Sequence, residues 1–259
     1  MPGDVFLLGH RGMLGHVVGR VFESAGYRLR TSNDRFEGEL EGGLLADVQR
    51  AGCGVVINCI GTTPARTDAR SLWLTNTLLP QALAARSGGA LLIHASSDGV
   101  FDGARGGYGT DAPPDAEDLY GLSKRLGELC LALGPVVVLR TSVVGPEPVP
   151  RSLLAWYLAQ AAPVRGFVNQ EWNGITSLSW AQCALRAARG ELAPGLHQPT
   201  CATPVTKFEL LTAIRDAFGG GPDIFETSAA TPLDRTLAPT IRLAPIQQQL
   251  AELKAWYCQ

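Results

Sequence analysis

A tyrosine and a lysine stand four residues apart in the stretch DLYGLSKRLGE, residues 118–128. The stretch is patterned as a helix, so the phenol of Tyr120 and the ammonium of Lys124 would lie one turn apart on the same face. A positive charge beside a phenol lowers its pKa and favours the phenolate, and such a pair can give or take a proton during catalysis. The spacing Y-x-x-x-K also occurs often by chance, with the tyrosine packed and the lysine solvated. The rest of the chain must therefore decide between these interpretations.

Two serines precede this helix, in HASSDGVFDG at residues 94–103. They follow an apolar run that predicts a strand, so Ser96 and Ser97 would lie at a strand end. A hydroxyl there can hydrogen-bond the carbonyl or alcohol oxygen of a substrate while Tyr120 serves as acid or base. Beside a nicotinamide, this set of groups would support hydride transfer to or from carbon.

A glycine-rich turn, GHRGMLG at residues 9–15, follows a short apolar run and opens a helical pattern. Glycine lets the backbone approach a pyrophosphate, and a helix N-terminus offers free N–H groups and partial positive charge. We therefore predict a dinucleotide site at this turn, the alternative being a turn that serves only close helix packing.

The end of the second predicted strand bears on which dinucleotide binds. A cofactor without a 2′-phosphate is usually marked by an acidic residue there. Here residues 31–33 contain no acid, and Asp34 is the first to follow. Arg11 lies inside the glycine turn and Arg30 lies close to the strand end, and arginine binds phosphate in a bidentate manner. We predict NADP(H) rather than NAD(H), although Asp34 could still reach a ribose.

Strands and helices alternate through the first part of the chain. We predict helices at 13–26, 70–86 and 119–133 among strands at 5–9, 27–31, 54–61, 90–96 and 135–142. This alternation predicts an α/β fold with a Rossmann-type doubly wound parallel sheet in residues 1–150. A proline-rich segment at 145–150 then leads to predicted helices at 152–161, 179–190, 206–218 and 245–257. Residues 151–259 are therefore expected to form a small, mostly helical C-terminal substrate lobe, whose segments could interleave with the first part.

Composition and charge narrow the class of protein. The chain has 259 residues, of which 46% are hydrophobic and 18% charged, and a formal net charge of −2. We expect a globular chain that binds neither nucleic acid nor membrane, so any site for an anion must be locally positive. No leader or membrane-spanning segment is evident, so we expect a cytoplasmic protein. The six cysteines form no C-x-x-C pair, so we expect free thiols. The four histidines lack metal-binding spacing, so we expect no metal site.

Taken together, these motifs resemble the extended short-chain dehydrogenase/reductase family, and within it the dTDP-4-dehydrorhamnose reductase group of sugar-nucleotide reductases. GHRGMLG is similar to the cofactor loop, SSDGVFDG to the family's S-T-D-Y-V-F-D-G, and YGLSKRLGE to its Y-G-x-S-K-x-x-G-E. LRTSVVGPE is similar to R-T-S-x-x-Y-G, and WNGITSLSWAQ to a segment of the substrate lobe. The resemblance covers nearly the full length. It implies NADPH-dependent reduction of the keto group of a nucleotide-linked 4-keto-deoxysugar.

The resemblance also implies roles for individual residues. The catalytic positions are Ser97, Tyr120 and Lys124. With Arg30 from the phosphate argument, the expected cofactor-binding residues are Gly9, Arg11, Gly12, Met13, Leu14, Arg30, Cys59, Ile60, Gly61, Tyr120, Lys124 and Thr141. The expected substrate-binding residues are Ser97, Asp98, Gly99, Trp172 and Asn173. Gly99 and Val143 stand where the family pattern has aromatic residues, so the sugar pocket is expected to differ in shape.

Some side chains keep two interpretations. Asp98 either orients Ser97 or caps a turn, and Arg140 either forms a structural ion pair, which we favour, or holds a diphosphate. Trp172 either stacks on a nucleotide base or packs in the small lobe, whereas Trp156 is expected to pack.

Two other functions remain open. A related epimerase or dehydratase would hold NAD tightly, but a dehydratase usually adds an acid–acid pair beside the serine, where this chain has only Asp98. A non-enzymatic NADP-binding regulatory subunit would use the same fold, and the intact set of Ser97, Tyr120 and Lys124 argues against it. A homodimer through helices 70–86 and 119–133, as in many members of the superfamily, is also open.

Overall fold

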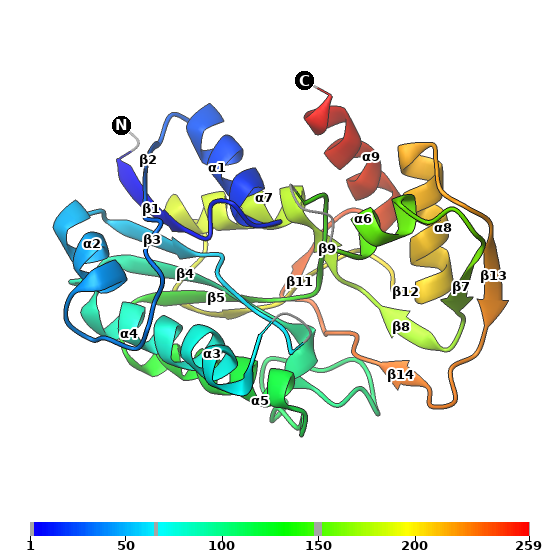
Figure 1. Ribbon diagram of the computed structural model, residues 1–259, viewed down its shortest axis with the longest axis horizontal. Coiled ribbons are helices and arrows are strands. Elements are labelled where there is room, and N and C mark those ends of the chain that lie inside the picture. The colour runs from blue at the N-terminus through cyan, green and yellow to red at the C-terminus, as the bar shows by residue number, and fades with distance from the viewer. Residues whose placement is uncertain (1–2, 65–66, 148–151, 259) are drawn as a thin grey trace.

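A computed structural model describes residues 3–64, 67–147 and 152–258. Its centre is a six-stranded sheet in the order β2-β1-β3-β4-β5-β10 (Figure 1). Every pairing between neighbours is parallel, which confirms the predicted Rossmann-type sheet. The strands are β1 (Asp4–Leu8), β2 (Arg28–Thr31), β3 (Val55–Asn58), β4 (Leu91–Ser96), β5 (Val136–Arg140) and β10 (Gly195–His197).

Helices cover both faces of this sheet (Figure 1). One face carries α1 (Gly15–Ser24) and α7 (Ser177–Ala188), and the other carries α2 (Gly43–Ala51), α4 (Leu79–Arg86) and α5 (Leu119–Gly127). Because both faces are covered, the inner strands are continuous apolar runs, and all five residues of β5 are buried. The sequence patterns had not predicted α2.

The helix predicted at 70–86 is not uniform. It consists of α3 (Ala69–Trp73), one π-helical turn (Leu74–Leu78) and α4. The π-turn contains Asn76, whose buried amide donates to the carbonyl of Thr62 at 2.9 Å and to Oγ of Ser123 at 3.0 Å. The turn thus ties this helix to α5, and α5 itself continues into a 3-10 helix (Glu128–Ala132).

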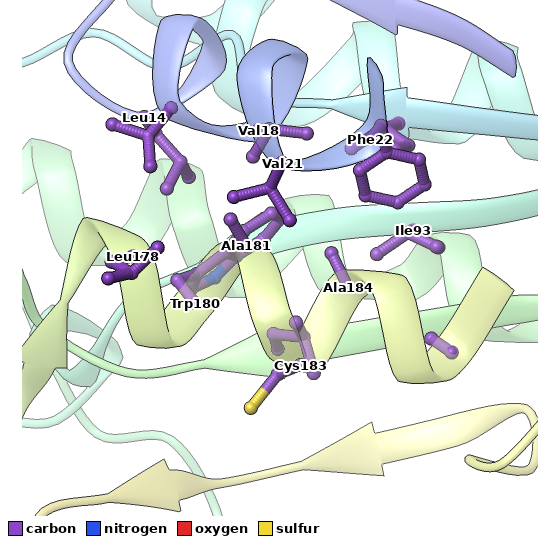
Figure 2. Close-up of a cluster of buried hydrophobic side chains, with 14 of the residues drawn as sticks. Leu14, Val18, Val21, Phe22, Ile93, Leu178, Trp180, Ala181, Cys183 and Ala184 are labelled. Carbon is purple, nitrogen blue, oxygen red and sulfur yellow. The ribbon is translucent and has the colours of Figure 1, made fainter. Parts of the chain in front are cut away.

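The two helices on the first face, α1 and α7, share one apolar core with the sheet. In Figure 2 the side chains of Leu14, Val18, Val21 and Phe22 face Trp180 and its neighbours on α7, with Ile93 of β4 below them. After α7 the chain enters β10, which pairs with β5. Segments from both sides of residue 150 therefore build the sheet-based part of the molecule.

The remaining C-terminal segments form the small lobe, at the right of Figure 1. Its helices are α6 (Leu153–Leu158), α8 (Lys207–Phe218) and α9 (Ile246–Tyr257). Short strands accompany them and pair in groups of two or three, so this lobe mixes helices with strands and is not mostly helical. These strands are β6 (Val143–Val144), β7 (Val164–Phe167), β8 (Gln170–Trp172), β9 (Ile175–Thr176), β11 (Pro199–Thr200), β12 (Val205–Thr206), β13 (Ile224–Thr227), β14 (Leu233–Asp234) and β15 (Ile241–Arg242).

None of the helices in the described residues has the length and apolar character needed to cross a membrane. Within the same ranges, no three His, Cys, Asp or Glu side chains are grouped so that they could hold a metal ion. The six cysteines are free thiols.

Candidate active site

The sheet opens a ligand crevice where its strand order changes direction. β2 lies on one side of β1 and β3 on the other, and ligands of such sheets bind at the carboxyl ends of the strands beside this switch. A cleft of about 360 Å³ lies there. Of the predicted residues, its lining includes Gly12, Met13, Leu14, Cys59, Ile60, Gly61, Ser97, Tyr120, Lys124 and Thr141.

The glycine turn after β1 packs tightly against the end of β3. Gly9 has a φ of 76°, and a β-carbon on it would come within 3.0 Å of the backbone of Cys59 and Ile60. A β-carbon on Gly15 would come within 2.1 Å of the Gly9 carbonyl oxygen. Both positions therefore require glycine. The turn leads directly into the N-terminus of α1, whose free N–H groups suit an anion such as a pyrophosphate.

Ser97, Tyr120 and Lys124 come together where β4 ends beside α5. Oγ of Ser97 donates to Oδ1 of Asp98 at 3.1 Å and accepts from N of Gly99 at 3.0 Å, which begins a 3-10 turn (Asp98–Val100). Nζ of Lys124 donates to the carbonyl oxygen of Ala95 at 2.6 Å. The bonds of Ser97 and the bond from Lys124 to Ala95 all lie at the end of β4. They fix the position of α5, which bears Tyr120, relative to Ser97.

The protonation of Tyr120 differs from the sequence expectation. Burial raises the pKa of Tyr120, and the charges of Asp98 and Asp118 raise it further, against a hydrogen bond with Ser97 that lowers it. Burial also lowers the pKa of Lys124 to about 8, against the charge of Glu128. Lys124, which was expected to lower the pKa of Tyr120, is not among the groups that shift it. The phenol remains protonated at neutral pH, which is the form that a proton donor needs.

Two cations of the small lobe, Lys207 and Arg235, act on Asp98, the residue after Ser97. Burial raises the pKa of Asp98, and the charges of Lys207 and Arg235, with the hydrogen bond from Ser97, counteract it. Nζ of Lys207 lies 5.5 Å from the ring centroid of Trp172. Nε of Arg235 is buried without a hydrogen-bond partner among the described residues.

Neither Lys207 nor Arg235 was predicted, because neither belongs to a motif. Lys207 is the first residue of α8, and Arg235 follows β14. The one available signal was indirect: an anionic substrate needs local positive charge in a chain whose net charge is negative.

Trp172 and Asn173, which were predicted to bind the substrate, are both buried. Trp172 is 3% exposed and packs in the core of the small lobe, so the packing interpretation describes it. Asn173 uses both ends of its amide on the backbone of Leu237, donating at 2.8 Å and accepting at 3.0 Å. It thus anchors the segment that bears Arg235. Trp156, expected to pack, is 44% exposed, and that expectation was wrong.

Arg140 forms the structural ion pair that was favoured for it. Its Nε and Nη2 donate to the carboxylate of Glu128 at 2.8 and 2.5 Å, and both side chains are buried. Oγ of Ser96 donates to the same carboxylate at 2.6 Å. Through these bonds the pair joins β5, the end of β4 next to Ser97, and the end of α5.

The two arginines predicted at the cofactor differ in their surroundings. Nε of Arg30 donates to Oδ2 of Asp4 at 3.2 Å, and Arg28 binds the same carboxylate at 2.7 Å. Asp4 begins β1, so Arg30 turns away from the strand end, and it is not among the described residues that line the cleft. Arg11 is exposed within the glycine turn itself. The predicted preference for the 2′-phosphate of NADP(H) therefore depends on Arg11 more than on Arg30.

Comparisons with known proteins agree with this architecture. The model of the RmlD substrate binding domain family matches residues 3–155. A comparison with curated proteins gives no significant match. Among solved structures, dTDP-4-dehydrorhamnose reductase from Bacillus anthracis in complex with NADP is 17% identical with a TM-score of 0.84, over 99% of this chain and 100% of that one.

Two further structures show the same fold. The dTDP-4-dehydrorhamnose reductase of Yersinia enterocolitica is 17% identical, with a TM-score of 0.76 over 98% of this chain and 99% of the other. A dTDP-glucose 4,6-dehydratase of Bacillus anthracis in complex with NAD is 16% identical, with a TM-score of 0.75 over 99% and 96% of the two chains.

Proposed function

Since the chain belongs to the RmlD substrate binding domain family, we propose that it reduces the keto group of a nucleotide-linked 4-keto-deoxysugar with NADPH. One observation supports this most: Ser97, Tyr120 and Lys124 line the same cleft as the glycine turn. This arrangement supports a proton donor beside a dinucleotide site. The similar reductases from Bacillus anthracis and Yersinia enterocolitica, the first in complex with NADP, support the same substrate class and cofactor.

The cofactor end of the cleft is built from backbone groups. The N–H groups at the start of α1 would hold a pyrophosphate, and Arg11 would supply positive charge for a 2′-phosphate. When bound, the nicotinamide supplies the hydride. The same fold holds NAD in the similar dehydratase, so the preference for NADPH depends on Arg11 and on the absence of an acid at residues 31–33.

The proton goes to the substrate oxygen from Tyr120. As the carbonyl carbon is reduced, negative charge develops on its oxygen, and a protonated phenol within reach neutralises it. Ser97 positions the same oxygen once its hydroxyl turns from Asp98 toward the substrate. The ammonium of Lys124 has donors left beyond its bond to Ala95, and its charge stabilises the phenolate that remains.

The nucleotide diphosphate is bound by Lys207 and Arg235. Both cations act electrostatically on Asp98, and Arg235 also acts on Tyr120. Nη2 of Arg235 lies 3.9 Å from Oδ2 of Asp118, which shares its charge. The Nε group of Arg235 has no protein partner among the described residues, so an anion can accept from it without displacing another bond.

Steady-state turnover with NADPH and a panel of keto-sugar nucleotides tests this proposal. Tyr120→Phe keeps the ring and removes the acid, so turnover should fall about a hundredfold or more. Tyr27→Phe, at a tyrosine packed against Phe22, is the matched control and should stay near wild type. Full activity of Tyr120→Phe would contradict the mechanism. NAD that copurifies and is identified by mass spectrometry would instead favour the epimerase or dehydratase alternative.

Assembly and location complete the proposal. Leucines on α5, on the 3-10 helix after it and at the residue that follows are 38–56% exposed, and they suit a homodimer through this face: Leu119, Leu126, Leu129 and Leu133. Light scattering should report a dimer for the wild type and a monomer for Leu129→Glu, and a monomeric wild type would contradict it. Free thiols support a cytoplasmic location, and two or more disulfides in freshly purified protein would contradict it.

A further inference from the structure

The C-terminal helix reaches back to the glycine turn through one histidine. Tyr257, the last residue of α9, has its hydroxyl in a hydrogen bond with Nε2 of His16. Nδ1 of His16 lies 2.7 Å from the carbonyl oxygen of Gly12. Gly12 lines the cleft. The mechanism proposed above uses neither Tyr257 nor His16, yet both are joined to the turn on which a dinucleotide would bind.

The direction of each hydrogen bond follows from the groups involved. A carbonyl oxygen only accepts hydrogen bonds, so Nδ1 of His16 must bear a hydrogen and donate it in the bond to the carbonyl of Gly12. In the neutral imidazole Nε2 is then an acceptor, and the hydroxyl of Tyr257 must donate to it. Burial raises the pKa of Tyr257 to about 12, so this hydroxyl keeps its proton at physiological pH. The tyrosine thereby selects the histidine tautomer that can hold Gly12.

Holding the carbonyl of Gly12 also orients the next amide. A trans peptide is planar, and its C=O and N–H point in opposite directions. The carbonyl of Gly12 accepts from His16 twice, from Nδ1 and from the backbone N at 3.2 Å. The N–H of Met13, in the same peptide, is therefore turned to the side away from His16, and Met13 lines the cleft.

Helix α9 connects this contact with the small lobe. Its Ile246 and Leu250 belong to the core of the small lobe, whereas Leu253 belongs to the core shared by α1 and α7. Near its end, the guanidinium of Arg20 on α1 lies 4.0 Å from the ring centroid of Trp256. One short helix thus begins among small-lobe residues, and side chains at its end contact α1, the helix that follows the glycine turn.

We propose that Tyr257 is a positioning residue for the dinucleotide: through His16 it holds the Gly12–Met13 peptide with its N–H toward the cofactor phosphates. The seating of α9 in the small lobe is thereby coupled to cofactor affinity. This inference depends on the dinucleotide site of the proposed function. It adds a contribution from the far end of the chain that no motif of the glycine turn contains.

The test measures the Kd of NADPH on the purified full chain by fluorescence titration, with thermal melting as a folding control. Tyr257→Phe removes only the hydroxyl and should weaken NADPH about three- to tenfold, the value of one hydrogen bond. Turnover at saturating NADPH should stay near wild type. Tyr27→Phe is again the matched control and should leave the Kd unchanged.

His16→Asn separates positioning from simple helix stabilisation. An asparagine amide can still donate to the carbonyl of Gly12, but it is too short to reach Tyr257. His16→Asn should therefore bind NADPH nearly as well as wild type, and adding Tyr257→Phe to it should cause no further loss.

A Tyr257→Phe variant that binds NADPH as tightly as wild type would overturn the relay alone. The relay would also be overturned by an undiminished effect of Tyr257→Phe in the His16→Asn background, because the hydroxyl would then act independently of the histidine. Wild-type protein that binds no NADPH would overturn the dinucleotide site itself, and with it the relay.

Discussion

The ring of Tyr120 lies directly against Gly99, so close that a β-carbon at residue 99 would come within 2.8 Å of Cε1 of the tyrosine. The same β-carbon would come within 3.2 Å of Oγ of Ser97. The family pattern has a tyrosine at this position. Here the absence of any side chain lets the ring of Tyr120 lie over the backbone of the turn that also bears Ser97.

Gly99→Ala should therefore displace the proton donor. The added methyl group must move the Tyr120 ring or the turn itself, and a misplacement of about 1 Å can cost on the order of a hundredfold in rate. We expect turnover to fall at least tenfold while the Kd of NADPH changes little, as measured by steady-state kinetics and fluorescence titration. Gly54→Ala is the control, because a β-carbon there meets nothing within 4 Å. Wild-type turnover of Gly99→Ala would show that the ring is free to move.

Substrate affinity should depend on the two cations of the small lobe. Lys207→Met or Arg235→Met removes a charge beside the site, and a charge-assisted hydrogen bond to an anion contributes about 1.5–3 kcal/mol. The KM for the nucleotide sugar should rise about tenfold or more, with an unchanged Kd for NADPH. Arg165→Met, at an exposed arginine of the same lobe, should leave both constants near wild type. A change in NADPH affinity alone would assign the cations to the cofactor instead.

These two predictions illustrate what the sequence could and could not provide. Gly9 and Ser97 follow β1 and β4 of one parallel sheet, and the helix after β4 bears Tyr120 and Lys124. The carboxyl ends of parallel strands meet at one edge of the sheet. Local patterns therefore sufficed to bring them together. Lys207 and Arg235 reach the same place only through the packing of short strands in the small lobe, and short strands pair through distant residues without a periodic signal.

Buried partners were equally out of reach. The sequence favoured an ion pair for Arg140 but did not identify Glu128 as its partner. Glu128 is the last residue of a family motif, and the motif gives it no role. The exposure of Trp156 and the burial of Trp172 depend on how α6 and β8 pack in the small lobe, and the residue types are the same. Composition alone does not distinguish two tryptophans.

Cofactor preference should depend on one arginine more than on the other. Arg11→Ala should weaken NADPH far more than NADH, because only NADPH has the 2′-phosphate, and wild type should prefer NADPH by about tenfold, or 1.4 kcal/mol. Arg30→Ala should have the smaller effect, since Arg30 is bound to Asp4. Fluorescence titration of each variant with both dinucleotides checks this. Equal affinity of the wild type for NADH would contradict the assignment.

The buried pair of Glu128 and Arg140 should contribute to stability. Glu128→Gln leaves the Arg140 charge buried without its counter-charge, and breaking such a pair costs about 3–5 kcal/mol. Denaturant unfolding should show this loss in the free energy of unfolding. Glu191→Gln breaks the exposed pair with Arg186 and should cost less than about 1 kcal/mol. Similar small losses at both sites would mean that the buried pair is relaxed by water.

The last prediction concerns the pH dependence of activity and its independence from unfolding. Lys124 must be charged to stabilise the phenolate, and burial lowers its pKa to about 8. The kcat/KM of the free enzyme should therefore fall as pH rises through about 8. Tyr120 does not cause this fall in kcat/KM, because burial raises the pKa of its phenol.

Stability should change in the opposite direction over the same range. The pKa of Lys124 in the folded state lies below the unfolded value of about 10.4, so between these values the unfolded chain binds more protons. The contribution of Lys124 to the free energy of unfolding therefore rises with pH across this window, as the folded state sheds a charge that is costly to bury. Kinetic pH profiles and denaturant titrations, run in the same buffers, should show activity falling while this contribution grows, and Lys124→Met should lack the growth. A loss of activity that tracked unfolding, in wild type and variant alike, would remove Lys124 from this role.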